Sequence, residues 1–411
     1  MKDRLILHCD ANCFYASVET VLNPVLRGKA VAVCGSTEER HGIVLAKSEK
    51  AKKAGVKTGM ANWQARECCK GLIIVPPQYE YYMKFSKYLH GIYERYTDLV
   101  EPFGMDECWL DLTPTLHKDG MAVAEEIRRT VKDELGITVS IGVSFNKIFA
   151  KLGSDMKKPD AITEITRENY QTKVWSLPCE ELLYCGRATT AKLNNMAIKT
   201  IGDIVRAGPE LMGKRFGKNG VALWKYASGN DTSRVAHQDF TMPAKSVGHG
   251  ITCVADLENM EEVRMVLIAL AQDIGHRLRV YKLKARGVQV YIRDSRLCSY
   301  LTQTQLETST QSEASVSQAA IALVEKSYAW NNPIRAITIS AINLVGERVA
   351  EQTTIFCDYK KVEKQSKLER AVDTIRGRFG KNAIAPAVLM NEHKMPQHSD
   401  REVIMPGMMY R

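Results

Sequence analysis

Residues 100–113, which read VEPFGMDECWLDLT, decide how the rest of this chain is interpreted. Asp106 and Glu107 lie side by side between two apolar segments of strand-like composition, and Gly104 before them permits a tight turn. The pattern predicts a short β-hairpin that carries two carboxylates near its bend. Adjacent residues of a regular strand point to opposite faces, so a turn or bulge is needed to aim both groups at one ion. An isolated acidic pair in such a place is more often a solvated turn.

A third carboxylate precedes this stretch in the chain. Residues 5–9 (LILHC) read as a buried strand that delivers Asp10 to its C-terminal end. Once an inserted segment at 14–75 is set aside, the strands and helices follow in the order β-α-β-β-α-β. That order predicts an α+β fold with a ferredoxin-like antiparallel sheet and helices on one face. The first strand then lies beside the hairpin, which brings Asp10 close to Asp106 and Glu107.

Three carboxylates at one sheet edge repel one another unless cations neutralise them. Two Mg²⁺ ions bridged by carboxylates are a recurrent solution in nucleotidyl transfer, and oxygen-only ligands suit Mg²⁺ or Mn²⁺ rather than zinc. The lysine-rich segments 47–53 and 147–158 offer positive charge for a triphosphate, although lysines on a helix are usually solvated. The sequence therefore predicts a candidate two-metal site for phosphoryl or nucleotidyl transfer.

Composition and charge limit the class of protein. The 411 residues suffice for two to four domains, and 45% hydrophobic with 25% charged residues is typical of a soluble globular protein without a membrane-spanning run. Eleven scattered cysteines and a start without the apolar region of a signal peptide predict reduced thiols in a cytoplasm and no zinc site. The basic excess behind the net charge of +10 is concentrated in residues 171–245, which suggests a polyanion partner, with a solvated basic face as the alternative.

The second half of the chain contains two further regions. Residues 175–234 read as short helices separated by glycines, with basic residues near the turns, an arrangement that offers helix N-termini to DNA phosphates. Residues 235–245 have the character of a linker. Residues 246–345 repeat the order β-α-β-β-α-β, and the tail 346–411 is polar.

Three motifs in this order resemble the Y-family translesion DNA polymerases of the DinB/UmuC kind. They are Asp10 with FYASVE at 14–19, GMDE at 104–107 and NKIFAKLGSDMKKP at 146–159. The resemblance extends from residue 5 to about residue 345. It implies a right-hand polymerase with a palm at 1–13 and 76–170, small fingers at 14–75, a helix-hairpin-helix-like thumb at 171–234, a linker at 235–245, a little finger at 246–345 and a tail at 346–411.

The resemblance also implies roles for residues of the palm. The implied catalytic and metal-binding groups are the side chains of Asp10, Asp106 and Glu107, with the backbone carbonyl of Ala11 as a further metal ligand. Tyr15 falls at the steric-gate position, where an aromatic ring rejects a ribose 2′-OH. From the residues alone Tyr15 could equally be core, because Phe14 and Tyr15 open a helix and only one of them can face inward.

Nucleotide contacts are implied for two lysines. Lys158, before Pro159, matches a palm lysine that reaches the incoming triphosphate. In the fingers the family places a tyrosine and an arginine on the triphosphate, and here those positions hold Glu49 and Lys52. Lysine keeps the positive charge but lacks the bidentate fork of arginine, and a glutamate beside a triphosphate is unfavourable unless it turns away or is paired.

DNA and a sliding clamp are the implied macromolecular partners. The predicted DNA contacts are two basic clusters, one in the thumb and one in the little finger: Lys214, Arg215 and Lys218, and Arg277, Arg279, Lys282, Lys284 and Arg286. The turn Cys185-Gly186-Arg187 departs from the glycine-x-glycine hairpin that is usual in the family's thumb. The predicted clamp-binding peptide comprises Gln352, Ile355 and Phe356.

The sequence thus predicts a monomeric, low-fidelity DNA polymerase that adds dNTPs to the primer 3′-OH of primer-template DNA with two Mg²⁺ ions, in damage bypass, DNA repair and the SOS response. A nucleotidyl cyclase shares the palm and the two-metal chemistry, but it would have neither a DNA-binding thumb nor the second β-α-β-β-α-β region. A non-catalytic DNA- or clamp-binding scaffold would have lost carboxylates, and only Glu49 points in that direction.

Overall fold

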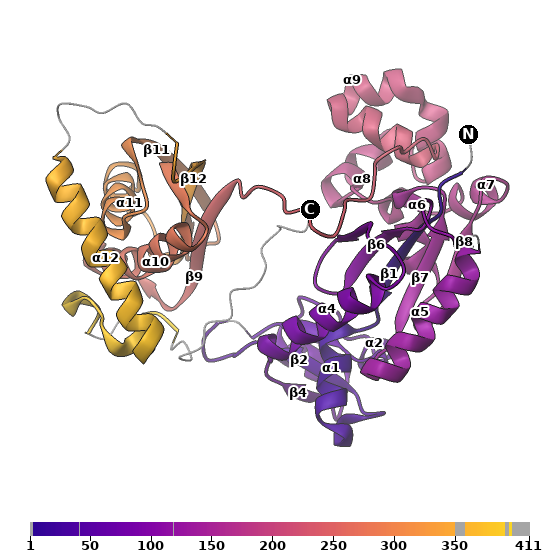
Figure 1. The fold of residues 1–411 in the computed structure, drawn as a ribbon, viewed down its shortest axis with the longest axis horizontal. Coiled ribbons are helices and arrows are strands. Elements are labelled where there is room, and N and C mark those ends of the chain that lie inside the picture. Colours follow the sequence, from indigo (N-terminus) through magenta and orange to yellow (C-terminus); the bar gives the residue numbers. More distant parts are fainter. Residues whose placement is uncertain (1–2, 41, 118, 350–357, 391–393, 397–411) are drawn as a thin grey trace. The chain divides into compact units, whose positions relative to one another are not determined.

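The computed structural model describes residues 3–40, 42–117, 119–349, 358–390 and 394–396 (Figure 1). Apart from a short loop, residues up to Met242 form one compact unit, and residues from Pro243 onward form a second. No helix in the described ranges is long and apolar enough to cross a membrane.

The first unit is built on a mixed sheet of five strands in the order β5-β6-β1-β7-β8. The first four strands give the predicted antiparallel ferredoxin-like arrangement, while β8 adds a parallel edge strand that the sequence did not indicate. The strands are β1 (Ile6–Ala11), β5 (Val100–Pro102), β6 (Glu107–Asp111), β7 (Val139–Ser144) and β8 (Ile162–Ile165).

Two helices close one face of this sheet, and a third covers the other. The helices α4 (Tyr79–Tyr93) and α5 (Gly120–Leu135) bury the alternate residues Leu7 and Cys9 of β1 in one apolar core. The intervening residues, including His8 and Asp10, point to the opposite face because side chains alternate along a strand. There α6 (Lys147–Met156) packs against β1 and β7.

The inserted segment forms the small fingers. Its sheet has the order β3-β2-β4, and its two helices are only five and seven residues long. The fingers contain β2 (Val31–Cys34), β3 (Val44–Lys47), α2 (Glu49–Lys53), α3 (Asn62–Cys68) and β4 (Ile73–Val75). The preceding helix α1 (Phe14–Leu22), which the sequence prediction assigned to the fingers, buries Phe14 and Val18 in the core of the palm.

The thumb is helical, as predicted. It consists of α7 (Tyr170–Val174), α8 (Arg187–Asn194) and α9 (Ile201–Ala227), which share an apolar core with α6 and β8 of the palm. The run α9 contains two breaks, at Gly208 with φ +77° and at Gly217 with φ +63°. Positive φ is readily adopted by glycine, so these two residues divide the run into short helices.

The second unit confirms the second β-α-β-β-α-β region, with a different strand order. Its antiparallel sheet has the order β11-β10-β12-β9, so the first strand lies at an edge rather than in the centre. The elements are β9 (Ser246–Leu257), α10 (Met260–Val280), β10 (Leu283–Asp294), β11 (Ser299–Thr310), α11 (Glu313–Ser327) and β12 (Ile334–Gly346). A further long helix, α12 (Tyr359–Phe379), follows.

We predict that Gly142→Ala destabilises the palm. A Cβ at Gly142 in β7 would lie 1.9 Å from the carbonyl oxygen of Ala150 in α6, which is backbone and cannot give way locally. Forced repacking of this kind costs about 3 kcal/mol, which would lower the thermal unfolding temperature of the first unit. Gly91→Ala is the matched control, because Gly91 lies in α4 with open space around it and should be neutral or slightly stabilising. Equal unfolding temperatures for the two variants would contradict the packing argument.

Candidate active site

The register of β1 and β6 brings two of the predicted carboxylates together. Asp10 lies directly opposite Glu107. The amide of Ala11 donates to the carbonyl of Asp106 at 3.0 Å, so the neighbouring pair Asp10–Glu107 is a non-hydrogen-bonded pair, in which side chains approach most closely. Both carboxylates therefore lie on the face of the sheet that α4 and α5 leave uncovered.

Asp106 joins them from the bend before β6. Because β6 begins at Glu107, Asp106 is not held to the alternation of the strand. Its side chain is half-buried, and loss of solvation, followed by the negative charges of Asp10 and Glu107, raises the pKa of Asp106 to about 7. Desolvation is the larger cause of this rise, and the charges of Asp10 and Glu107 add to it.

Two lysines, one from the middle of α6 and one from the loop after it, supply positive charge to this cluster. Lys158 Nζ lies 2.7 Å from Asp10 Oδ2, and Lys151 Nζ lies 3.2 Å from the same oxygen and 2.8 Å from Glu107 Oε2. Burial alone would lower the pKa values of both lysines, but the surrounding carboxylates raise them above their ordinary value. Both ammonium groups are therefore charged at neutral pH.

The buried His8 completes the surroundings of Glu107. His8 Nε2 lies 3.4 Å from Glu107 Oε2, and His8 Nδ1 lies 2.9 Å from the hydroxyl of Ser154. Burial would raise the pKa of Glu107, but the contacts with His8 and Lys151 lower it to about 2. Burial lowers the pKa of His8, so its ring is neutral.

The donor set fits hard divalent cations, since it consists of carboxylate oxygens on one sheet edge. Glu107 Oε2 is buried and forms no hydrogen bond in the described part of the chain, although the ammonium of Lys151 is close. As the side chains stand, however, no three carboxylate, histidine or cysteine groups among the described residues converge closely enough to hold an ion. Lysine ammonium groups occupy the space between the carboxylates, so ion binding requires Lys151 and Lys158 to move.

Lys147, at the start of the same helix, has a different role from the one its charge suggested. Its ammonium lies 2.7 Å from Glu101 and 4.4 Å from the centre of the Trp109 ring, and its carbonyl accepts a hydrogen bond from the indole of Trp109. Lys147 is therefore part of the packing between α6, β5 and β6. Of the lysines in segment 147–158, it is Lys151 and Lys158 that reach the carboxylates.

Tyr15 lies at the edge of the palm core, near the hairpin that carries Asp106. Phe14 takes the inward position, while the half-buried ring of Tyr15 stacks on Tyr82 with centroids 4.2 Å apart and planes 10° apart. The hydroxyl of Tyr15 donates to the sulfur of Met105 at 3.5 Å. Burial and the charge of Asp106 raise the pKa of Tyr15 to about 12. The ring is thus neutral, fixed in orientation and close to the hairpin.

Glu49, the unexpected residue in the fingers, is paired rather than isolated. Its carboxylate accepts a hydrogen bond from the thiol of Cys13 at 3.1 Å and lies 3.8 Å from the ammonium of Lys52. Cys13 directly precedes α1 and follows the strand that carries Asp10. Because Glu49 is paired, its negative charge is less unfavourable near a triphosphate. The same contact leaves Lys52 less available to bind the triphosphate.

The predicted DNA contacts of the thumb are exposed. Lys214, Arg215 and Lys218 flank the break at Gly217, where a new helical segment begins. Amide groups at the start of such a segment, together with three cations, form a surface suited to phosphate.

The predicted DNA contacts of the little finger divide into two groups. Arg279 is buried in ion pairs on the helical side of the sheet, 3.2 Å from Glu369 and hydrogen-bonded to Asp373, and Arg277 is paired with Asp273 in the same helix. In the structure both arginines are committed to ion pairs within the domain, and their contact with DNA stays a prediction.

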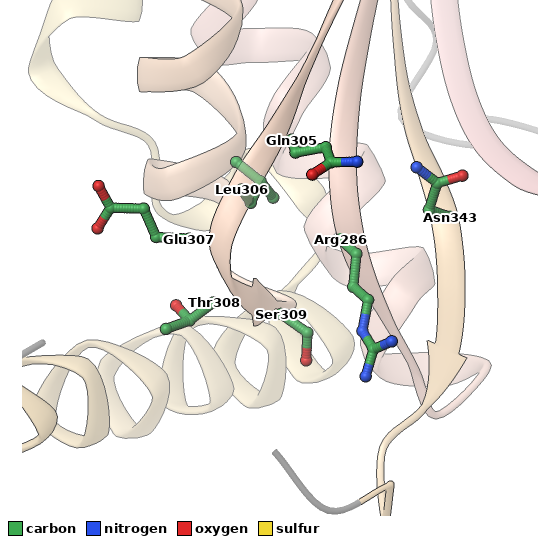
Figure 2. Close-up of a pocket in the computed structure, with 7 residues that line it drawn as sticks. All are labelled: Arg286, Gln305, Leu306, Glu307, Thr308, Ser309 and Asn343. Carbon is green, nitrogen blue, oxygen red and sulfur yellow. The ribbon is translucent and has the colours of Figure 1, made fainter. Parts of the chain in front are cut away.

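Arg286, in β10, is exposed and lines a cavity of about 400 Å³ (Figure 2). The cavity lies at an irregularity in the pairing of β10 with β11. Between the pairs Gly287–Gln305 and Ala285–Thr310, β11 has four residues where β10 has one. Figure 2 shows Arg286, Ser309 and Asn343 around it. Lys284 precedes Arg286 in the same strand and is half-buried. The predicted clamp residues Gln352, Ile355 and Phe356 lie outside the described residues.

Comparison with known proteins places the chain in a family. Residues 9–155 match the model of the impB/mucB/samB family, and residues 244–355 match the model of its C-terminal domain. A DNA polymerase IV of Acetivibrio thermocellus is 47% identical over 95% of this chain and 98% of its own length. The chain belongs to the Y family of DNA polymerases. It is a DNA-directed DNA polymerase of the DinB type.

Further comparisons agree with this assignment. A DNA polymerase IV of Moorella thermoacetica is 35% identical over 94% of this chain and 96% of its own length. A solved Y-family DNA polymerase chimera superposes with a TM-score of 0.75 at 23% identity, covering 83% of this chain and 99% of the chimera, which supports the fold. The agreement includes the thumb and the second unit, so the cyclase and scaffold alternatives are set aside.

Three features of the site were not predicted from sequence. Lys151, which links Asp10 to Glu107, is four residues from Lys147 in α6, a spacing that places both on one helix face. That spacing was the sequence signal from which a position of Lys151 beside Lys147, facing the sheet, could have been predicted. Nothing in the sequence indicated that His8 would contact Glu107, or that Glu101 would pair with Lys147, because both contacts depend on packing between distant segments.

Proposed function

We propose that this polymerase is a translesion enzyme that extends a primer by two-metal nucleotidyl transfer. The gathering of Asp10, Asp106 and Glu107 at one hairpin is the observation that carries the proposal. In the reaction the primer 3′-oxygen forms a bond to the α-phosphorus of a dNTP. The bond between that phosphorus and the oxygen that bridges it to the β-phosphate breaks, and pyrophosphate leaves.

Asp10, Asp106 and Glu107, with the backbone carbonyl of Ala11, would hold two Mg²⁺ ions, and Mn²⁺ would satisfy the same oxygen ligands. When bound, the ions activate the primer hydroxyl and neutralise charge on the triphosphate. The residues of the chain supply the anionic pocket and its orientation, since the β1–β6 register fixes the spacing of Asp10 and Glu107. The raised pKa of Asp106 expresses the same demand for positive charge.

Lys151 and Lys158 would change partners as the substrate enters. Without ions, their ammonium groups neutralise Asp10 and Glu107. When its pair with Asp10 breaks, Lys158 would bind the triphosphate, the role expected of it from the family resemblance. Lys52 contributes a further positive charge from the fingers, although its contact with Glu49 competes for it.

Tyr15 would act as the steric gate against ribonucleotides. Because the ring of Tyr15 is stacked on Tyr82, it would not move aside for a ribose 2′-hydroxyl. Discrimination between dNTP and rNTP would then arise from the rigidity of the ring as well as from its size. The small fingers, with helices of only five and seven residues, would make few contacts with the nascent base pair. The site would therefore accept damaged templates. We further propose that the enzyme acts in DNA repair and the SOS response, in the cytoplasm.

DNA would be held by contacts that carry no sequence information. Lys214, Arg215 and Lys218 of the thumb and Lys284 and Arg286 of the little finger are the proposed phosphate contacts. We also propose that the polymerase acts as a monomer tethered to a sliding clamp through Gln352, Ile355 and Phe356.

Asp106→Ala should abolish primer extension while leaving the fold intact. Loss of one of three carboxylates removes several kcal/mol of metal-dependent stabilisation, so we expect the rate of dNTP addition to fall about 1,000-fold. Gel-based primer extension with Mg²⁺ measures this, with Asp98→Ala as a control that removes an exposed aspartate of the same unit. Equal extension by Asp106→Ala and wild type would refute the metal assignment, and absence of extension in wild type would refute the proposed reaction.

Tyr15→Ala should admit ribonucleotides. Removal of the ring leaves space for a 2′-hydroxyl, and we expect the ratio of kcat/KM for dNTP over rNTP to fall by about 100-fold, or about 3 kcal/mol of discrimination. Tyr88→Ala is the matched control, because Tyr88 is an exposed tyrosine of α4 that lies outside the stack on Tyr82. Unchanged sugar selectivity in Tyr15→Ala would show that Tyr15 is packing only.

A further inference from the structure

Asn12, which directly follows β1, joins that strand to the loop after α6. Its amide oxygen accepts hydrogen bonds from the backbone amide of Asp160 at 2.8 Å and from the hydroxyl of Thr138 at 3.0 Å. Its amide nitrogen donates to the hydroxyl of Ser140 at 2.9 Å, and the residue is only 4% exposed. A buried amide whose oxygen and nitrogen are both hydrogen-bonded is held in one orientation, so the bond to Asp160 is a fixed feature of the palm.

Asp160 is held from its other side as well. Arg128 Nη1 and Lys132 Nζ of α5 donate to its two carboxylate oxygens at 2.7 and 2.9 Å. Burial would raise the pKa of Asp160, but the hydrogen bonds from Lys132 and Arg128 lower it, so the carboxylate is charged at neutral pH. Its backbone has φ +56°, a left-handed conformation that aspartate adopts more readily than most residues. Asp160 is therefore anchored to the end of β1 through its amide and to α5 through its carboxylate.

Lys158 lies two residues before Asp160 in the same loop. Its ammonium is 2.7 Å from Asp10 Oδ2 and 2.9 Å from Asp155 Oδ1. The loop thus meets β1 through an ion pair, Lys158–Asp10, and also through the hydrogen bond between Asn12 and Asp160. In the proposed reaction the ion pair breaks, whereas the hydrogen bond uses none of the carboxylates of the site and can persist.

This difference bears on the affinity for nucleotide. Lysine carries its ammonium on a flexible four-carbon stem. With the loop backbone held in place, the ammonium of Lys158 would reach the triphosphate by rotation of its side chain, and only the freedom of that side chain would be lost. A loop that moved away from β1 when the ion pair broke would have to be ordered again at each binding event, which weakens binding.

We propose that Asn12 is a positioning residue for dNTP binding, which holds the loop after α6 through the amide of Asp160 while Lys158 leaves Asp10 for the triphosphate. The inference rests on the role proposed above for Lys158. Asn12 itself contacts neither substrate nor metal in this scheme and acts only through the loop. Its loss therefore weakens nucleotide binding selectively, whereas a purely structural asparagine would affect the stability of the palm alone.

The Kd of the correct dNTP tests the proposal, measured with the full-length polymerase and primer-template DNA whose primer ends in a dideoxynucleotide, so that no chemistry follows binding. We expect Asn12→Ala to raise this Kd about tenfold. Asp160→Asn, which weakens the ion pairs with α5 but keeps the backbone amide, should raise it about threefold. Asn169→Ala is the matched control, because Asn169 Oδ1 accepts from the backbone amide of Thr166 at 2.9 Å in the loop between β8 and α7. Its Kd should change less than about twofold.

The same measurement in a Lys158→Ala background separates positioning from general damage to the palm. Lys158→Ala alone should raise the Kd about tenfold. Asn12→Ala should then add less than about twofold, because the ammonium that Asn12 positions is gone. If Asn12→Ala weakens binding by the same factor with and without Lys158, Asn12 acts on the palm in general and the inference is overturned.

The outcomes also separate this inference from the proposed function. If Lys158→Ala leaves the Kd unchanged, the triphosphate role of Lys158 fails, and the inference fails with it. If Lys158→Ala weakens binding but Asn12→Ala and Asp160→Asn do not, that role stands and the inference alone fails. Thermal unfolding is recorded for every variant. Should Asn12→Ala be unfolded at the assay temperature, Asp160→Asn decides, and an unchanged Kd for that variant overturns the inference.

Discussion

The antiparallel register that sets Asp10 opposite Glu107 governs the chemistry of the palm. It is held by backbone hydrogen bonds on both sides of β1, and a shift of β1 by one residue would turn Asp10 toward the apolar core under α4 and α5. The same register places Gly142 beside His8, where the missing side chain lets the backbone of α6 approach β7. Lys151 reaches the carboxylates only because of that approach. Strand pairing and helix packing thus position charge of both signs at one edge of the sheet.

Electrostatics explains why the cluster is stable without ions. Three carboxylates gathered at this hairpin would be strongly unfavourable alone, and the raised pKa of Asp106 is the remaining sign of that cost. Lys151 and Lys158 reduce it by ion pairing with Asp10 and Glu107. In the proposed reaction these ammonium groups would have to leave before divalent ions could bind the same carboxylates.

Much of this was predictable from sequence, and the exceptions share a cause. The β-α-β-β-α-β order, the hairpin and the nearness of Asp10 followed from strand patterns and the turn at Gly104. The roles of Lys147 and Arg279 did not, because a basic residue in a helix looks the same whether it meets solvent, a ring or a buried carboxylate. Arg279 is paired with Glu369 and Asp373 about 90 positions later in the chain, which no local pattern shows. The strand order of the little finger also differs from that of the palm although the element order is the same.

The account can be tested most directly by locating metal in the palm. Diffraction from crystals grown with Mn²⁺, at a wavelength where manganese scatters anomalously, reports ion positions independently of activity. We predict anomalous density between Asp10, Asp106 and Glu107, with the ammonium of Lys158 withdrawn from Asp10. Manganese bound elsewhere, or absent while Lys158 remains paired with Asp10, would contradict the claim that these three carboxylates form the metal site.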